Sequence, residues 1–128
     1  MCGILGIFGS DKDEVTLRRI ARDLSSRMKH RGPDWCGTKV SGANAIAHER
    51  LAIIDPESGE QPLLSVDGEL ILAANGEIYN HMELKAGLLK GATFLTGSDC
   101  EVILPLYEKF GEAGLKVRPS SHHPRVRS

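Results

Sequence analysis

The chain opens on Met1-Cys2-Gly3-Ile4-Leu5-Gly6-Ile7-Phe8, and residues 4–8 of this run predict a buried strand that is apolar on both faces apart from its glycine. Cys2 directly precedes the strand, behind a methionine that a small second residue normally allows to be removed. Removal would leave Cys2 with a free α-amino group, whose pKa of about 7.7 to 8.0 suits a proton acceptor near neutral pH. One residue would then supply both a nucleophilic thiol and its base. The alternative is a small apolar cysteine that only begins a core strand.

The composition is that of an ordinary water-soluble chain. Its 128 residues are 41% hydrophobic and 26% charged, with a net charge of −1, which suits one domain and indicates neither a nucleic acid nor a membrane as partner. No apolar run reaches membrane-spanning length, so we expect a cytoplasmic location. The three cysteines lack the paired spacing of a zinc site or a disulfide framework, and we expect reduced thiols and no metal.

The last thirteen residues differ from the rest. Residues 116–128 carry four basic and no acidic residues, which leaves −5 for residues 1–115 because the four tail charges raise the total to −1. Two prolines and the lack of a periodic apolar pattern predict a disordered, basic tail. The tail has neither aromatic residues nor ligand spacing, so we expect it to bind neither nucleic acid nor metal.

Between the opening strand and the tail, helices and strands alternate. An apolar stripe predicts a first helix, capped by Asp11 or Asp13 and ended before residues 30–33, with core positions at Leu17, Ile20, Ala21, Leu24 and Met28. Residues 45–48 and 70–74 predict further strands, separated by a turn at residues 56–59. A short helix is expected at residues 82–89. The order indicates a mixed α and β fold.

A last helix has a stronger signature. Ser98 and Glu101 form a Ser-x-x-Glu capping box, and the helix stripe is Val102, Ile103, Leu106, Tyr107 and Phe110.

Arg50 is a charged residue followed at once by an apolar segment. Its planar guanidinium can bind a carboxylate through two parallel hydrogen bonds, which suggests a specific anion. An arginine paired with Glu49 or Asp55 is an equally good interpretation.

Asn75-Gly76 closes the strand at residues 70–74, and this dipeptide first of all signals a hairpin turn. A chemical interpretation has about equal weight, because a side-chain amide and an unhindered glycine N–H offer two donors to an oxyanion. Asp99 lies in the first turn of the last helix, where it would offset the helix dipole or receive a substrate ammonium. Together with Cys2 and Arg50, these residues describe a site for a free α-amino acid with an amide side chain, and glutamine fits.

The chain resembles the N-terminal glutamine amidotransferase domain of the asparagine synthetases, a member of the class II, N-terminal-nucleophile amidotransferases. The resemblance covers residues 1–115 and rests on Met1-Cys2-Gly3-Ile4, on His-Arg-Gly-Pro-Asp-Trp at 30–35, on His-Glu-Arg-Leu-Ala-Ile-Ile-Asp at 48–55, on Gln61-Pro62-Leu63, on Asn-Gly-Glu-Ile-Tyr-Asn-His at 75–81 and on Thr-Gly-Ser-Asp-Cys-Glu-Val-Ile at 96–103.

The resemblance implies an α+β fold, a four-layer α/β/β/α sandwich of largely antiparallel sheets, with Cys2 at the start of a central strand. It implies that Cys2 is the nucleophile, that Asn75 and Gly76 form the oxyanion hole, and that Arg50 holds the glutamine carboxylate. Asp99 would hold the α-ammonium. The pocket would be completed by Glu77 and by the backbone of Leu51, Ala52, Ile53 and Ile54.

In the full family enzyme, the ammonia released from L-glutamine goes to a synthetase domain that activates aspartate with ATP and magnesium. This sequence carries no such domain, so we expect no cofactor within it, an amidotransferase fold incomplete at its C-terminus, and the synthetase domain or a second copy of the chain as partners. We also expect a poorly stable chain, which a cooperative thermal transition of a soluble monomer would contradict. The alternatives are a non-catalytic truncated remnant or interaction fragment, and the glutaminase domain of another class II amidotransferase.

Overall fold

The computed structural model describes residues 2–33, 35–50 and 60–116. Along these residues the chain forms, in order, β1 (Gly3–Ile7), α1 (Glu14–Ser26), β2 (Trp35–Ser41), β3 (Asn44–Arg50), β4 (Leu63–Leu64), β5 (Ile71–Leu72), α2 (His81–Ala86), the 3₁₀ helix η1 (Asp99–Val102), α3 (Ile103–Phe110) and the 3₁₀ helix η2 (Gly111–Lys116). The predicted α+β class is confirmed. The predicted turn at residues 56–59 and the tail from residue 117 onward lie outside the described residues.

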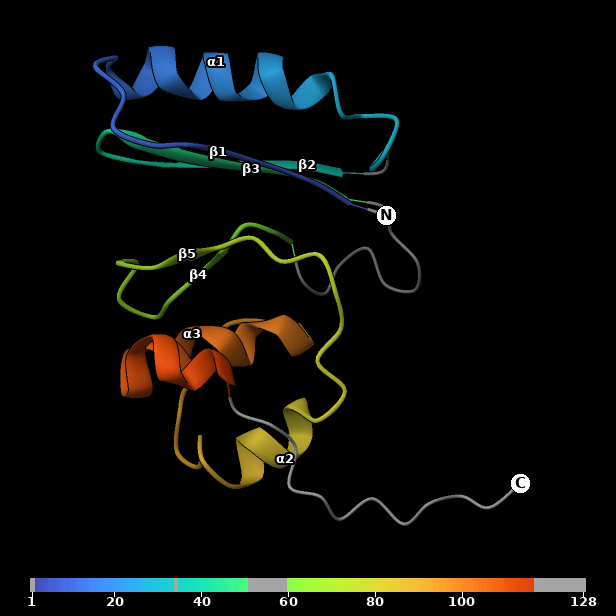
Figure 1. Ribbon diagram of the computed structural model, residues 1–128, viewed down its shortest axis with the longest axis vertical. Helices are drawn as coiled ribbons and strands as arrows, with labels where there is room; N and C mark the ends of the chain where they lie inside the picture. The colour runs from blue at the N-terminus through green and yellow to red at the C-terminus, as the bar shows by residue number, and fades with distance from the viewer. Residues whose placement is uncertain (1, 34, 51–59, 117–128) are drawn as a thin grey trace.

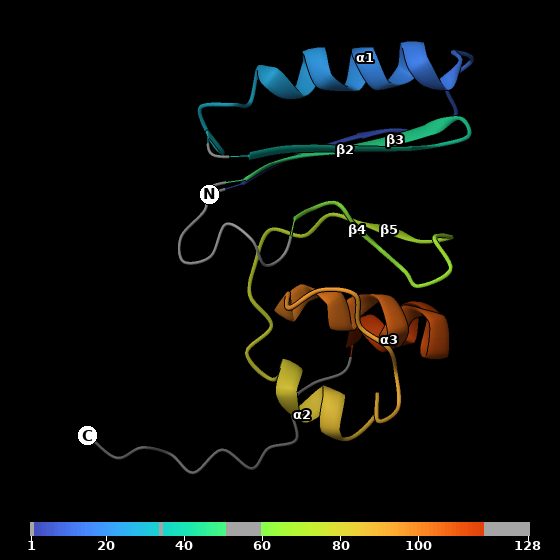
Figure 2. The same ribbon diagram turned by 180° about the vertical axis from the view of Figure 1, so that it is seen from behind.

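Two antiparallel sheets stand one above the other. The first has the strand order β1-β3-β2, and the second pairs β4 with β5. Figures 1 and 2 show α1 over one face of the three-stranded sheet and the β4–β5 pair on its other side, with α3 and α2 beyond that pair. The three-stranded sheet therefore has a helix on one side and a second sheet on the other.

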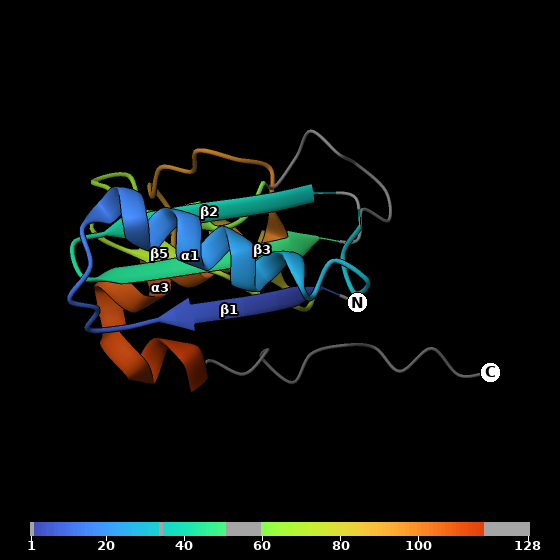
Figure 3. The same ribbon diagram turned by 90° about the horizontal axis from the view of Figure 1, so that it is seen from above.

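Strand β1 is present, but the expectation of a fully buried, central strand is wrong within the described residues. It lies at the edge of its sheet, as Figure 3 shows, and pairs only with β3. Alternate side chains of a strand point to opposite faces, so Leu5 and Ile7 pack against α1 while Ile4 and Phe8 stay 42% and 73% exposed. The run of apolar residues had suggested burial on both faces.

Helix α1 begins where the sequence predicted. Asp13 is its N-cap, accepting hydrogen bonds from the Thr16 backbone N–H at 3.0 Å and from the Thr16 hydroxyl at 2.7 Å. Leu17 and Ala21 of the predicted stripe are buried against Ala45 of β3. Leu24 is exposed, and the buried position in the last turn is Ser25 instead. A polar contact replaces the expected apolar one there, because the Ser25 hydroxyl donates to Glu49 at 2.5 Å.

The strand predicted at residues 45–48 is β3, and it is the second strand of a hairpin whose first strand, β2, the sequence analysis missed. The register runs from Trp35 opposite Arg50 to Ser41 opposite Asn44, with Gly42 in the turn at a φ of 54°. Most β2 side chains are exposed or half-buried, so the strand has no apolar run to reveal it.

The second region, residues 60–116, has short elements. The strand predicted at residues 70–74 is reduced to β5, and the helix predicted at residues 82–89 is the six-residue α2. A cluster of Leu84, Leu89, Val102 and Leu106 holds α2 to the C-terminal helices. Both predicted elements are present, but each is shorter than the stretch of residues for which it was predicted.

The predicted capping box is wrong. Ser98 makes no side-chain hydrogen bond to the helix, and the buried Glu101 carboxylate instead accepts from the N–H groups of Leu95 and Thr96 and from the Thr96 hydroxyl. The helix also starts as 3₁₀, with fewer residues per turn than an α-helix, and this changes the face that later residues present. Leu104 is buried, whereas Tyr107 and Phe110 of the predicted stripe are exposed.

Candidate active site

The fold brings Cys2 and Asn75 together although 73 positions separate them. The Asn75 side-chain Nδ2 donates to the Cys2 carbonyl oxygen at 3.5 Å, and Cys2 itself is half-buried. Asn75-Gly76 is not a hairpin turn, because the chain leaves β5 and continues into α2 without forming a further strand with it. The structure therefore holds a side-chain amide beside the residue that directly precedes β1.

Arg50 lies at the same end of the three-stranded sheet. Gly3 pairs with Glu49, so Cys2 and Arg50 are the next residues along two neighbouring antiparallel strands. Glu49, one of the two carboxylates considered as partners of Arg50, accepts a hydrogen bond from Ser25 in the last turn of α1. The other, Asp55, lies outside the described residues. The half-buried Arg50 thus lies on the central strand, at the same end of the sheet as Cys2.

Asp99 and Cys100, at the start of η1, fasten the segment that follows Asn75. The Ile78 N–H donates to Asp99 Oδ2 at 2.5 Å, and the Cys100 thiol donates to the Gly76 carbonyl oxygen at 3.4 Å. Burial raises the pKa of the Cys100 thiol to about 11, and the negative charge of Asp99 adds to the shift. Cys100 is therefore a protonated hydrogen-bond donor at neutral pH and not a second nucleophile.

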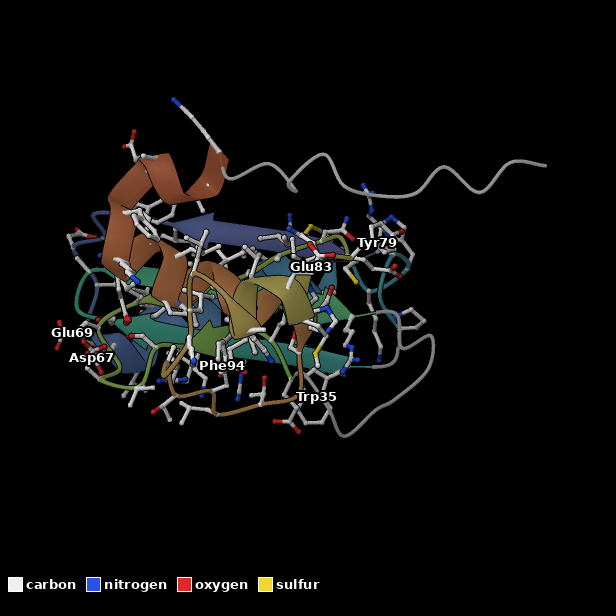
Figure 4. The ribbon with its side chains drawn as sticks, turned by 90° about the horizontal axis from the view of Figure 1, so that it is seen from below. Trp35, Asp67, Glu69, Tyr79, Glu83 and Phe94 are labelled. Carbon is white, nitrogen blue, oxygen red and sulfur yellow. The ribbon has the colours of Figure 1, made fainter. Side chains whose placement is uncertain are left out.

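Negative charge gathers on this side of the site. A hydrogen bond to the Glu77 carboxylate raises the pKa of Tyr79, and the charges of Glu77 and Asp99 both act on it. The same two carboxylates also raise the pKa of Cys100. Figure 4 shows Tyr79 at the end of the molecule where β1 begins, with Asp67 and Glu69 at the opposite end. Two carboxylates at one place favour a cation such as an ammonium group.

The structure places the site residues suggested by the sequence as follows. Asn75 lies beside Cys2, and Gly76 and Glu77 follow it in the segment that Asp99 and Cys100 hold. Arg50 stands at the same end of the three-stranded sheet as Cys2. The four pocket residues proposed to act through their backbone lie outside the described residues, namely Leu51, Ala52, Ile53 and Ile54.

Sequence analysis missed the residues that hold Ala74, directly before Asn75. His48 Nε2 lies 3.2 Å from the Ala74 carbonyl oxygen, and the Ala74 N–H donates to Gln61 Oε1 at 2.6 Å. Burial lowers the pKa of His48, and the charge of Arg50 lowers it further. Both residues stand in motifs that the sequence displayed, His48-Glu49-Arg50 and Gln61-Pro62-Leu63, but neither pattern indicated a contact with residue 74.

The arrangement offers a thiol, a side-chain amide donor, two carboxylates and a guanidinium at the end of the molecule where β1 begins. Among residues 2–33, 35–50 and 60–116, no group of three or more His, Cys, Asp or Glu side chains could hold a metal ion. Within the same residues, no helix is long and apolar enough to cross a membrane.

Comparison of the sequence shows that the chain belongs to the glutamine amidotransferase domain family, which it matches over residues 1–118. It is 54% identical over 112 residues to a glutamine-hydrolyzing asparagine synthetase of Brassica oleracea, and 56% identical over 113 residues to one of Sandersonia aurantiaca. A third relative is glutamine-hydrolyzing asparagine synthetase 1 of Arabidopsis thaliana, 52% identical over 111 residues.

These matches cover 87–88% of this chain but only 19–21% of the relatives, so the chain spans about a fifth of their length. The resemblance to the asparagine synthetases is confirmed. The three relatives favour the asparagine synthetases over the other class II amidotransferases as the group that this chain resembles.

Proposed function

We propose that this chain carries a glutamine-hydrolysing site in which Cys2, freed of Met1, is the nucleophile. The observation that supports it most is the hydrogen bond from Asn75 Nδ2 to the Cys2 carbonyl, which keeps an amide donor beside the proposed nucleophile across 73 residues. An oxyanion hole needs donors placed next to the attacking atom before the reaction begins. Family membership supplies the independent support.

The proposed reaction starts when the Cys2 thiol passes its proton to the α-amine and the thiolate attacks the side-chain carbonyl carbon of glutamine. The carbonyl oxygen becomes negative and accepts hydrogen bonds from the Asn75 amide and the Gly76 N–H. The carbon–nitrogen bond then breaks, the ammonium of Cys2 returns the proton to the departing nitrogen, and ammonia and a glutamyl thioester result. Water, deprotonated by the same amine, attacks the thioester and releases glutamate and the thiol.

The two ends of glutamine would be held by opposite charges. Arg50 would bind the α-carboxylate through a bidentate pair, and Asp99 with Glu77 would receive the α-ammonium. The backbone of residues 51–54 would line the remaining wall of the pocket. Asp99 already accepts from Ile78 through Oδ2, so its other oxygen, Oδ1, is the one proposed for the ammonium.

The larger context is part of the same proposal. The order of helix, sheet, sheet and helices supports the front part of a four-layer α/β/β/α sandwich. The relatives are named glutamine-hydrolyzing asparagine synthetases, which supports transfer of the ammonia to a synthetase domain that uses aspartate, ATP and Mg²⁺ outside the matched region. A cytoplasmic setting is proposed on the three free cysteines, and a second copy of the chain remains a proposed partner.

The test is covalent labelling with a diazoketone analogue of glutamine. Intact-mass spectrometry first establishes whether Met1 is absent, and peptide mapping then locates the adduct. We expect one adduct at Cys2, protection by excess glutamine, and no adduct in Cys2→Ser.

Two matched controls separate the site from general thiol chemistry. Cys36→Ser, which changes the exposed cysteine, should be labelled as the unmodified chain is. Folded protein that retains Met1, or that reacts equally at Cys36 and Cys2, would overturn the proposal.

A further inference from the structure

Ala74 is held by a side chain on each of its two polar backbone groups. Its carbonyl oxygen lies 3.2 Å from His48 Nε2, and its N–H donates to Gln61 Oε1 at 2.6 Å. It follows the short strand β5 and precedes Asn75 directly, so no strand ladder sets its geometry. The backbone that leads into the proposed oxyanion hole is therefore fixed by two side chains from elsewhere in the chain.

The His48 contact determines the state of the imidazole. A carbonyl oxygen only accepts hydrogen bonds, so the proton must be on Nε2, and Nδ1 is then an acceptor. The side chain is 1% exposed, and Nδ1 has no hydrogen-bond partner among the described residues. Burial lowers the pKa of His48, so the ring is neutral at physiological pH. A buried, neutral histidine with one directed bond is suited to hold a neighbour in place.

Gln61 is fixed in turn by the first sheet. A Cβ atom built on Gly37 of β2 would lie 1.9 Å from the Gln61 carbonyl oxygen, so the two backbones touch at a position that only glycine allows. Gly37 pairs with His48 in the β2–β3 register. The two residues that hold Ala74 are thus anchored to one place on the three-stranded sheet, and Figure 1 shows that sheet directly above the β4–β5 pair.

We propose that His48 and Gln61 are positioning residues that aim the Asn75 amide at the Cys2 reaction centre by fixing both peptide groups of Ala74. This inference rests on the proposed function. A rotation at Ala74 would swing the Asn75 side chain away from Cys2, and a displacement of about 1 Å in a catalytic group can cost roughly a hundredfold in rate. The oxyanion develops only as the reaction approaches the transition state. A misplaced Asn75 amide would therefore lower kcat and leave the affinity for ground-state glutamine unchanged.

Two pairs of substitutions separate the hydrogen bonds from the volume of the side chains. Gln61→Met removes the acceptor and Gln61→Glu keeps one, while His48→Leu removes the donor and His48→Gln keeps one. Glu69→Gln, at the far end of the molecule, is the control for a surface change (Figure 4). All are made in the full chain, and circular dichroism establishes that each folds.

The first readout needs no activity. Amide hydrogen exchange is measured by NMR at residues 74–78 and compared with exchange at Leu17, in the core beside α1. Gln61→Met and His48→Leu should speed exchange at residues 74–78 by about tenfold or more, as removal of a fixed hydrogen bond allows local opening, and leave Leu17 unchanged. Unchanged exchange at residues 74–78 would overturn the inference whether or not the chain hydrolyses glutamine.

The second readout is chemical. The aldehyde analogue of glutamine adds the Cys2 thiol to form a tetrahedral hemithioacetal whose oxygen occupies the oxyanion position, whereas glutamate only binds. We expect Gln61→Met and His48→Leu to lose about tenfold to a hundredfold in affinity for the aldehyde and in kcat, with glutamate affinity and KM within about twofold of the unmodified chain.

The variants that keep a hydrogen-bonding group, Gln61→Glu and His48→Gln, should recover most of the lost aldehyde affinity and kcat. Equal losses of affinity for the aldehyde and for glutamate would show a merely structural role. The same conclusion would follow if variants that remove the hydrogen bond behaved like variants that keep it. An unmodified chain that binds neither compound would instead reject the proposed function, and the exchange measurement would still decide whether Ala74 is fixed as described.

Discussion

Two regions of the molecule are organised differently: a regular region, residues 2–33 and 35–50, and an irregular region, residues 60–116. The first region has strands of five and seven residues and a 13-residue helix, held by backbone ladders and one apolar cluster. The second has two strands of two residues and helices of four to eight residues, and its loops are held by side chains that bond to the backbone. Gln61, Asp99 and Glu101 all work in this way.

The difference explains how the candidate site is built. Cys2 and Arg50 come from strand ends of the regular region, where register fixes them relative to each other. Asn75, Gly76 and Asp99 come from the irregular region, where backbone N–H groups are not all consumed by ladders. A regular sheet supplies rigid placement, and a loop held by side chains supplies donors for chemistry.

The largest effect is expected in the core of the regular region. Leu17→Ala removes a side chain that is 1% exposed and packs against Ala21 and Ala45, so it should lower the free energy of unfolding by about 2 to 5 kcal/mol or unfold the chain outright. Urea unfolding followed by circular dichroism measures the change. Val15→Ala, at a position 80% exposed on the same helix, should change it by less than about 0.5 kcal/mol. Similar values for the two variants would contradict the description of this core.

A somewhat smaller effect is expected where the two regions touch. Gly37→Ala places a methyl group 1.9 Å from the Gln61 carbonyl oxygen, and the overpacking should cost about 3 kcal/mol. Gly76→Ala is the matched control for stability, because nothing lies within 4 Å of the added atom. Thermal unfolding of the two variants compares them. If Gly37→Ala were as stable as Gly76→Ala, the two regions would not pack as described.

The irregular region should be sensitive to single polar atoms. Glu101→Gln replaces one acceptor oxygen by an amide donor that faces the N–H groups of Leu95 and Thr96, and it should cost about 1 to 3 kcal/mol. Glu108→Gln on the exposed side of α3 is the control. Hydrogen exchange at residues 95 and 96 would report the loss locally, and unchanged protection there would show that Glu101 does not hold this loop.

The smallest effect is expected at the starts of α1 and η1, where the sequence predicted a side-chain cap for both helices. Asp13→Ala removes a side-chain cap of α1 and should cost about 1 kcal/mol, while Ser98→Ala removes none and should cost close to zero. Urea midpoints of the two variants provide the comparison. Equal losses would mean that Ser98 caps its helix in solution.

Sequence patterns predicted the regular region better than the irregular one. The α1 stripe and its Asp13 cap could be read because a helix repeats its contacts every turn, whereas β2 exposes most of its side chains and lacks that signal. In the irregular region, the Glu101 carboxylate accepts from Leu95 and Thr96 and not from the Ser98 N–H, a choice between nearby donors that spacing does not decide. Cys2, Asn75 and Asp99 were predicted as site residues from their chemistry and from the family resemblance, and their roles stay predictions. The supports at His48 and Gln61 depend on tertiary contacts with Ala74 that no local pattern contains.

The contact between Cys2 and Asn75 also dictates when the site can form during synthesis. A ribosome that has released only the first sheet, which ends at Arg50, would present the thiol and Arg50 without their amide partner, because 25 further positions (51–75) must emerge before Asn75 can dock. Asp99 emerges later still. The nascent polypeptide thus carries its proposed nucleophile from the outset but acquires the proposed oxyanion donors, Asn75 and Gly76, only after the whole first sheet has emerged.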